Sequence, residues 1–351
     1  MRFDSATQTL KCLYCGREED IANAGHVPIE HAFDPSEPDD HLVGNTDWGL
    51  RQFTLHCDSC SGEFIVPEAV TAGICPFCAS AKVINRQNAG SIRPETIIPF
   101  KLSMEQALTS FRDWKKKRWF VPNAFKNGHV DSALRGVYIP YWTFDADTAS
   151  SYTAQRGDYH YRTETRTRTV DGKTETYTVQ VRYTVWTSVS GSYAQWYNDV
   201  LIPASNRYDE SLLKELSNFN LSQLREYQPE YLSGYVAERY TIGRNAGWRR
   251  ARSRIDSWID SSVKRQIGGD EISQLNINSR YFGLTYKHLL LPVWSAAYSY
   301  RSKPYQYMVN AQTGLVSGTV PRSPWKITLF TLMCIVLVAA AVYGAYYYDL
   351  F

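Results

Sequence analysis

Six of the seven cysteines in this 351-residue chain stand in Cys-x-x-Cys pairs, the spacing at which two thiolates bind one metal ion. Cys57-Asp-Ser-Cys60 and Cys75-Pro-Phe-Cys78 are separated by fourteen residues. Two such knuckles on facing hairpins complete a tetrahedral site of four thiolates, which suits zinc. Four protein ligands leave no open position, so we predict a structural zinc site in a ribbon over residues 51–86. A redox dithiol and uncoordinated thiols are the alternatives.

A third pair, Cys12-Leu-Tyr-Cys15, has no cysteine partners nearby in the sequence. One interpretation is that a histidine completes the site, and the candidates are His26, His31 and His41. The other is that the first half of a ribbon is missing, because residues 3–12 resemble the strand and turn between two knuckles. The true start would then lie upstream, or this half-ribbon has degenerated. We therefore predict a partial knuckle over residues 1–20, with a second zinc ion left open.

Residues 16–50, between the knuckles, are rich in Asp and Glu, with only Arg17 opposing them. Three prolines interrupt any periodicity, so an acidic flexible linker is expected over residues 21–50. Such a segment would repel both nucleic acid and lipid phosphates.

The C-terminal region is apolar, and residues 327–348 contain no charge. As a helix this run is about 33 Å long, enough for a hydrocarbon core of about 30 Å. Trp325 lies at one end and three tyrosines at the other, as in interfacial aromatic belts. Its length argues against the alternative of a buried core helix. We predict a transmembrane helix over residues 325–348.

The flanks of this span predict its orientation. Arg322 and Lys326 precede it, whereas Asp349 is the one charged residue after it, so the positive-inside rule keeps residues 1–322 in the cytoplasm. The N-terminus lacks the apolar region of a secretory signal, and a mean hydropathy of −0.38 excludes a polytopic protein. We expect a single-pass, tail-anchored protein of the inner (cytoplasmic) membrane, where thiols stay reduced.

Composition limits the partners of the intervening region. The net charge of +3 excludes a chain that is basic throughout, but local basic patches remain. One patch, Lys115-Lys116-Lys117-Arg118, ends a helix that a Ser103-x-x-Gln106 capping box opens and that runs to about Trp119. A solvated helix end is the simplest explanation. Contact with anionic lipid head groups is a more specific explanation, and binding of nucleic acid is the third.

A second basic patch lies in a helix expected over residues 245–267 and ended by Gly268-Gly269. Its apolar face carries Trp248, Ala251, Ile255, Ile259 and Val263. Its arginines stand early in the helix, where the helix dipole disfavours cations, so they suggest an anionic partner; a solvated helix face is the alternative. They are Arg249, Arg250, Arg252 and Arg254. A shorter helix is expected over residues 209–218.

Residues 136–205 are strand-like, and Asp171-Gly172 predicts a two-residue hairpin turn. That turn sets Arg168 opposite Glu175 and Thr167 opposite Thr176. The hairpin of residues 160–186 is polar on one arm, so it should project from the core. It is either a partner-binding strand edge or an inert protrusion.

A weak internal repeat relates residues 136–142 to residues 289–294, each with a proline two residues before a tryptophan. We expect Pro140 and Pro292 to start edge strands, and Trp142 and Trp294 to pack into the core. A further hairpin is expected over residues 285–320, with its turn at residues 310–314. The fold class predicted for residues 90–320 is a β-rich α+β domain, with the repeat suggesting two related halves.

No phosphate-binding loop, dinucleotide fingerprint, zincin motif or hydrolase elbow occurs, and the histidines are scattered. We therefore predict that the protein is not an enzyme. A membrane enzyme of unrecognised type is the alternative, and it would show a polar pocket near the junction of the two halves.

Several short motifs in combination resemble a known family over nearly the whole chain. They are the cysteine ribbon, Ile-Ile-Pro99-Phe-Lys101, Trp119-Phe-Val-Pro122, Gly136-Val-Tyr-Ile-Pro-Tyr-Trp-Thr-Phe-Asp145, Tyr231-Leu-Ser-Gly234-Tyr, Leu290-Leu-Pro-Val-Trp294 and the C-terminal span. The chain is similar to bacterial membrane-anchored zinc-ribbon proteins of the YdjG type, within the TFIIB-type zinc-ribbon family. Such proteins resemble a double ribbon, and the missing first knuckle is a departure that puts the second zinc ion in doubt.

The resemblance implies an adaptor that holds SPFH-domain proteins or relatives of phage shock protein A at the bacterial membrane, in a membrane-stress response. Its members are often labelled primosomal protein N′ or helicase-like, which gives the main alternative, a membrane-tethered nucleic-acid-binding ribbon. A helicase needs a phosphate-binding loop that this sequence lacks.

Overall fold

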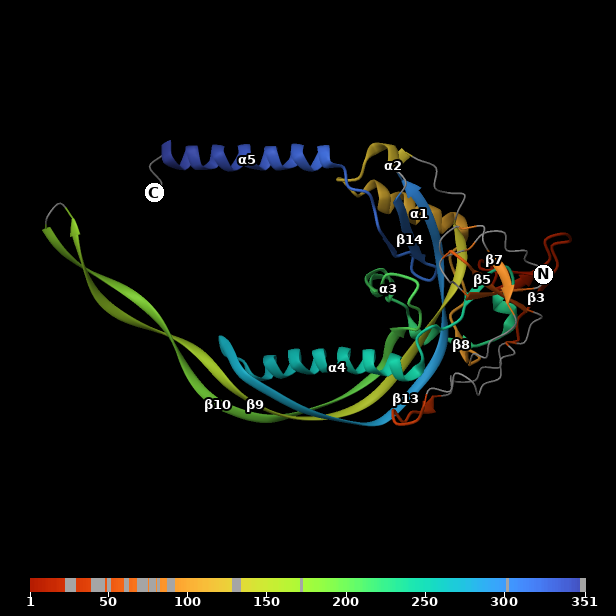
Figure 1. The fold of residues 1–351 in the computed structure, drawn as a ribbon, viewed down its shortest axis with the longest axis horizontal. Coiled ribbons are helices and arrows are strands. Elements are labelled where there is room, and N and C mark those ends of the chain that lie inside the picture. The colour runs from red at the N-terminus through yellow and green to blue at the C-terminus, as the bar shows by residue number, and fades with distance from the viewer. Residues whose placement is uncertain are drawn as a thin grey trace.

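The computed structural model describes residues 1–22, 30–38, 48, 52–59, 63–67, 75, 80, 83–86, 92–127, 134–170, 173–300 and 303–347. Three long strands dominate it: β9 (Arg135–Val170), β10 (Lys173–Pro203) and β13 (Glu271–Tyr300). β9 lies in the middle and pairs antiparallel with both others. Figure 1 shows them as a curved, twisted band that runs along most of the molecule.

Shorter strands extend this band into a 12-stranded sheet, ordered β11-β8-β13-β9-β12-β6-β5-β7, with the other strands branching from that path. Their bounds are β4 (His31–Ala32), β5 (Gln52–Cys57), β6 (Glu63–Pro67), β7 (Val83–Arg86), β8 (Thr96–Ile97), β11 (Arg225–Glu226), β12 (Val236–Glu238), β14 (Lys303–Asn310) and β15 (Val316–Gly318). A separate three-stranded sheet joins β1 (Arg2–Asp4), β2 (Thr9–Lys11) and β3 (Glu18–Glu19).

The predicted register of the long hairpin is confirmed. Arg168 pairs with Glu175 and Thr167 with Thr176, while the turn residues 171 and 172 lie outside the described part of the chain. The pairing of β13 with β9 ends at Glu271 opposite Gly157. Beyond that point residues 158–170 and 173–185 form a two-stranded β-ribbon. From here on 'the ribbon' means this projecting hairpin and not the predicted zinc ribbon of residues 51–86.

The expectation that Pro140 and Pro292 start edge strands was wrong, because both prolines lie inside long, internal strands. On one edge of its strand, each proline lies between two stretches that pair with two different neighbouring strands. Pro140 lies between the residues of β9 that pair with β10 and those that pair with β12, and its carbonyl accepts from Ala204 N (2.9 Å). Pro292 lies likewise between β8 and β14, and its carbonyl accepts from Ala311 N (3.0 Å). Neither position requires an N–H for the ladder, so proline costs no sheet hydrogen bond there.

The two tryptophans that follow these prolines are buried, as predicted, and they are satisfied in the same way. Trp142 Nε1 donates to Ile242 O (2.8 Å), just before helix α4 (Arg244–Ile267), and Trp294 Nε1 donates to Leu102 O (2.9 Å), just before helix α1 (Met104–Lys116). A short strand precedes each helix: β12 precedes α4 and pairs in parallel with β9, and β8 precedes α1 and pairs in parallel with β13. The pattern of short strand, helix and long strand therefore occurs twice.

The predicted helices are present, although α1 ends at Lys116, three residues before the expected Trp119. α1 begins at the Ser103 capping box, with both reciprocal hydrogen bonds formed, and α3 (Glu210–Leu216) is capped by Asp209. α2 (Asn123–Asn127) follows α1, and two 3₁₀ turns span Leu221–Gln223 and Pro229–Leu232. α4 buries the predicted apolar face and ends at Gly268, whose φ of +67° favours glycine.

α4 lies on the concave face of the long strands (Figure 1) and supplies one side of a hydrophobic core. The other side comes from Phe144, Tyr152 and Ala154 of β9 and Val200 and Ile202 of β10. A second core beneath α1 contains Phe100, Phe111, Trp294 and Tyr307, with the rings of Phe111 and Tyr307 stacked at 3.6 Å. The coarse α+β prediction is thus confirmed.

Ile255 tests the packing of α4, because it is fully buried at the centre of this interface. We expect Ile255→Ala to lower the free energy of unfolding by about 2–5 kcal/mol through lost burial and the cavity left behind. Thermal unfolding of the detergent-purified protein measures the loss. Ser253→Ala, exposed on the same helix, is the matched control and should change stability by less than about 0.5 kcal/mol. Equal effects of the two substitutions would contradict this packing.

Candidate functional site

The structure brings the segments that carry two of the cysteine pairs together. Cys57 is the last residue of β5 and pairs with Val83 of β7. Cys57 and Cys75 are both buried in one apolar cluster with Phe64 and Tyr208.

A short polar contact adds to this. Ser59 lies within the first knuckle and Ser80 lies just after the second, and their Oγ atoms are 2.7 Å apart. The other two predicted ligands, Cys60 and Cys78, lie outside the described residues. Among the residues that the structure does describe, no group of three or more His, Cys, Asp and Glu side chains is placed to hold a metal ion.

The Cys12–Cys15 segment forms a tight turn on the small N-terminal sheet. Gly16 N donates to Cys12 O (2.9 Å), with Gly16 at φ +75°, and Cys12 N donates to Arg17 O (2.8 Å). Hydrogen bonds from the backbone N–H groups of Cys15 and Tyr14 lower the pKa of the Cys12 thiol.

Of the histidines considered as further ligands for this pair, His26 and His41 lie outside the described residues. His31 pairs with Glu95, with Nε2 2.8 Å from Oε1, and its ring packs against Tyr286.

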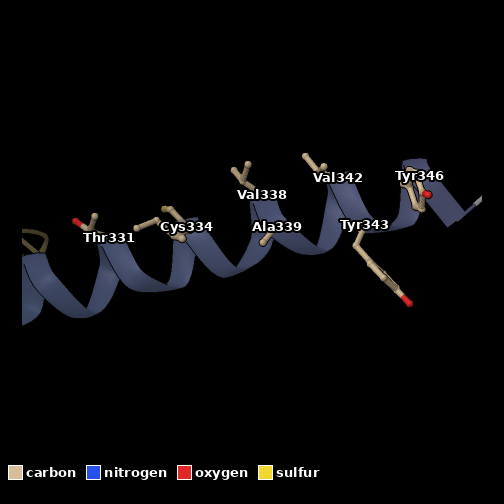
Figure 2. Close-up of a pocket in the computed structure, with 8 residues that line it drawn as sticks. Thr331, Cys334, Val338, Ala339, Val342, Tyr343 and Tyr346 are labelled. Carbon is tan, nitrogen blue, oxygen red and sulfur yellow. The ribbon is translucent and has the colours of Figure 1, made fainter. Parts of the chain in front are cut away.

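The apolar C-terminal helix, α5 (Pro324–Tyr347), is long and apolar enough to span a membrane. None of its apolar segment is buried against the body. Along one face its side chains line a shallow apolar groove of about 720 Å³ (Figure 2). Thr331, which lines that groove, donates its hydroxyl to Ile327 O (2.9 Å), so this donor is satisfied within the helix. The structure thus confirms a candidate anchor over the predicted residues.

The base of α5 is attached to the loop between α1 and α2. Ser323 N donates to Phe120 O (2.7 Å), and Lys326 Nζ donates to Val121 O (2.9 Å) and Asn123 Oδ1 (2.7 Å). The ring of Phe330 packs edge-on against the rings of Trp119 (5.7 Å) and Phe120 (5.4 Å). We call residues 116–120 and Lys126, together with the first turn of α5, the corner.

The basic run of α1 lies at this corner, although its members differ in environment. Lys115 is only 5% exposed, and its ammonium lies over the rings of Phe111 (5.5 Å) and Phe125 (5.4 Å), so it is not available to an outside partner. Lys116, Lys117 and Arg118 are exposed. The side chain of Lys116 is 3.6 Å from Asp113, and the Arg118 guanidinium covers the Trp114 ring at 4.6 Å.

The arginines of α4 form no comparable patch. Arg254 donates to Leu201 O (2.7 Å), Arg250 pairs with Glu210 (3.7 Å), and Arg252 lies 3.9 Å from Asp256. Arg249 is exposed. The helix therefore directs its arginines to different neighbours.

The ribbon exposes both polar and aromatic side chains. One face carries the charged residues of β9, which pair locally: Glu164 bonds Arg162 (2.7 Å) and Arg166 (3.3 Å), and Arg168 bonds Glu175 (3.2 Å). The opposing strand exposes Tyr177, Tyr183 and Val185. Among the described strands β10 pairs with β9 alone, so its outer edge is open along the ribbon.

A partly buried ionic cluster, which no sequence motif predicts, lies around Asp145 in the first third of β9. Asp145 accepts hydrogen bonds from Asp199 N (2.5 Å) and Thr285 Oγ1 (2.8 Å). Lys287 Nζ bonds Asp199 (2.7 Å) and Glu30 (3.0 Å). Bulges in both neighbouring strands, with Asp199 at φ +51° in one, bring these groups together, and no sequence pattern announces a bulge of this kind.

The charges of this cluster depend on one another. Burial acts to lower the pKa of Lys287, but hydrogen bonds to Asp199 and Glu30 outweigh it and leave that pKa raised. The bond from Lys287 lowers the pKa of Glu30, whereas burial raises the pKa of Asp145. The cluster links Glu30, which the sequence places in the acidic linker, to the central sheet, where β4 also pairs with β13.

Comparison with known proteins finds one relative that spans nearly the whole chain. An uncharacterized protein named YdjG, from Bacillus subtilis (strain 168), is 26% identical over 343 residues, which cover 93% of this chain and 89% of that protein. No family model matches the chain, and no solved structure matches it. The similarity to a YdjG protein is therefore supported, while membership of a zinc-ribbon family stays a prediction.

Lys287→Met tests the ionic cluster. The substitution leaves Asp199 and Glu30 without their cation, so we expect the free energy of unfolding to fall by about 2–4 kcal/mol at pH 7.5. The wild-type contribution of Glu30, whose pKa is lowered, is present above its usual pKa and is lost as the pH falls, so the loss should shrink at pH 4. Thermal unfolding at both pH values measures it.

Lys264→Met is the matched control for this experiment, because it breaks an exposed pair with Asp260 (2.8 Å) and should cost less than about 1 kcal/mol at either pH. A loss for Lys287→Met that is the same at pH 4 and pH 7.5 would contradict the electrostatic account.

Proposed function

We propose that this protein is a single-pass, membrane-anchored adaptor whose body faces the cytoplasm of a bacterial cell and recruits protein partners to the inner membrane. The observation that carries the proposal is α5, which is exposed along its length and attached at its base to the folded body. At 24 residues it is about 36 Å long, sufficient to cross the bilayer. Arg322 and Lys326 at its base favour the cytoplasmic side for the body.

The position of the ribbon limits how the protein can be oriented at the membrane. In Figure 1 the ribbon and α5 extend from the body toward the same side of the molecule. Charged side chains and an open strand edge exclude the ribbon from hydrocarbon. We infer that the ribbon lies outside the hydrocarbon and that α5, beyond its attachment at the corner, leads away from the ribbon when it crosses the bilayer.

We further propose that the ribbon is the partner-binding element. Its open β10 edge presents unpaired N–H and C=O groups, which bind an added strand, and its exposed tyrosines supply contact area. The resemblance to proteins of the YdjG type suggests SPFH-domain or phage-shock-protein-A-like partners. We interpret the repeated pattern of short strand, helix and long strand as two related halves that build the rigid base of this ribbon.

A structural zinc ion in the N-terminal region belongs to the same proposal. The burial of Cys57 and Cys75 in one cluster, and the contact between Ser59 and Ser80, support four thiolates from the two knuckles around one metal ion. The ion would tie the knuckles together, and β6 connects this region to the central sheet through β12. The Cys12–Cys15 turn is a candidate for half of a second site.

The other functions considered have less support from the contacts. Nucleic-acid binding would use the arginines of α4, and most of these have partners within the body. An enzyme would use a polar pocket where the two halves meet, but there His288 is fully buried against Trp142 (4.6 Å) and Tyr240 (5.5 Å). Burial lowers the pKa of His288 to about 4, so its imidazole is neutral and sealed from solvent.

Cys57→Ser tests the zinc site. We expect the full-length protein to lose one equivalent of zinc, measured by elemental analysis, and its N-terminal region to become protease-sensitive, because metal-binding free energy is folding free energy at such sites. Cys334→Ser, in α5, is the matched control and should retain the metal. Unchanged zinc content in Cys57→Ser would overturn the assignment.

Two deletions test the adaptor function. Removing residues 324–351 should release the protein, and with it the SPFH-domain or phage-shock-protein-A-like partner, from the membrane fraction. Replacing residues 161–182 by Asn-Gly should leave the protein at the membrane but release the partner, because His160 and Tyr183 already pair and can flank a two-residue turn. Quantitative immunoblots of membrane and soluble fractions measure both effects.

Asp171→Asn is the control for the second deletion, since it also creates an Asn-Gly turn but keeps the ribbon. A partner that stays at the membrane in both deletion strains would contradict the adaptor proposal.

A further inference from the structure

We propose that the corner is a binding site for anionic phospholipid head groups beside the anchor. This inference rests on the proposed function in that it takes α5 to cross the bilayer. It deepens that function by assigning a lipid class to the end of α1 and the loop that follows it, which the anchor does not need for insertion.

Position is the first argument. Ser323 and Lys326, at the start of α5, are hydrogen-bonded to the α1–α2 loop, so this loop lies where the helix enters the membrane. Residues within one turn of the start of a span lie at the level of the head groups. The basic end of α1 is therefore held at the depth of lipid phosphates, whatever direction α5 takes beyond its base.

Charge is the second argument. Lys116, Lys117 and Arg118 are exposed at this end, and Arg322 is exposed just before α5. Among the described residues no carboxylate pairs with Lys117 or Arg118, and Asp113 is the one acid bonded to the group, through Lys116. Because the net charge of the whole chain is only +3, this is a local concentration of positive charge. Lipid phosphates would neutralise it.

Aromatic side chains give the third argument. Trp119 and Trp325 are 64% and 76% exposed, which is unusual for tryptophan in a folded protein but typical at a membrane interface. Trp119 follows the basic run directly and contacts Phe330 of α5. Cations beside exposed tryptophan rings match a lipid monolayer, in which the phosphates lie next to the apolar region. An acidic protein partner would need no exposed tryptophans beside a span.

The corner is also rigid, which favours binding. Lys126 Nζ donates to Lys116 O (3.1 Å), which closes the C-terminal end of α1, and buried Lys115 packs between Phe111 and Phe125. The exposed cations thus extend from a fixed backbone, so little order has to be imposed when a head group binds.

The test uses the full-length protein in mild detergent, with dioleoylphosphatidylglycerol or dioleoylphosphatidylcholine added and bound lipids counted by native mass spectrometry. We expect the wild type to prefer phosphatidylglycerol. The triple variant Lys116→Gln, Lys117→Gln, Arg118→Gln should lose that preference, by about fivefold for each charge removed and on the order of a hundredfold in all. Equal binding of phosphatidylglycerol by the variant and the wild type would overturn the proposal.

A matched triple variant removes the same charge elsewhere, from exposed residues of α3 and α4: Lys214→Gln, Lys264→Gln and Arg265→Gln. It should keep the wild-type preference, and loss of the preference in this variant too would also overturn the proposal, because binding would then follow net charge alone.

Alkaline extraction of membranes from the same strains separates this inference from the anchor. All three proteins should resist extraction if α5 spans the bilayer. A wild type that is extracted refutes the anchor, whereas resistant proteins with equal lipid preferences refute only the head-group site.

Discussion

Backbone pairing of β9 with β10 on one edge and β13 on the other is the constraint on which the rest of this structure depends. It fixes which side chains face α4, and so creates the core beneath that helix. The bulges in its two partner strands assemble the cluster of Asp145, Asp199 and Lys287. Where β13 stops, the remaining two strands continue as the ribbon. These two ladders on β9 thus determine the core, the polar cluster and the projecting element.

Much of this arrangement follows from local sequence signals. The Asp171-Gly172 turn and the alternation around it are enough to predict the pairing of Arg168 with Glu175, because a two-residue turn fixes the register of both strands. α1 begins at a capping box, α4 ends at a glycine, and α4 has an apolar face with a period of 3.6 residues. These features depend on residues close together in the chain.

Other features depend on distant partners, and sequence reasoning did not find them. Pro140 and Pro292 suggest strand edges, but their tolerance comes from gaps between neighbouring strands that only the assembled sheet reveals. β8 and β12, of two and three residues, are too short to show any periodicity. Lys115 reads as one of four equivalent cations, yet packing against two phenylalanine rings withdraws it from the surface. The corner itself required the fold, because residues 116–120 and α5 are about two hundred positions apart in the sequence.

The central claim is that α5 crosses the membrane while the body, with its ribbon, stays in the cytoplasm. Thiol labelling tests it most directly, with a membrane-impermeant maleimide applied to intact spheroplasts carrying Thr176→Cys in the ribbon or Tyr346→Cys near the end of α5. We predict that Tyr346→Cys is labelled from outside, and that Thr176→Cys is labelled only after the membrane is permeabilised. Labelling of Thr176→Cys in intact spheroplasts, or protection of both positions until permeabilisation, would contradict the account.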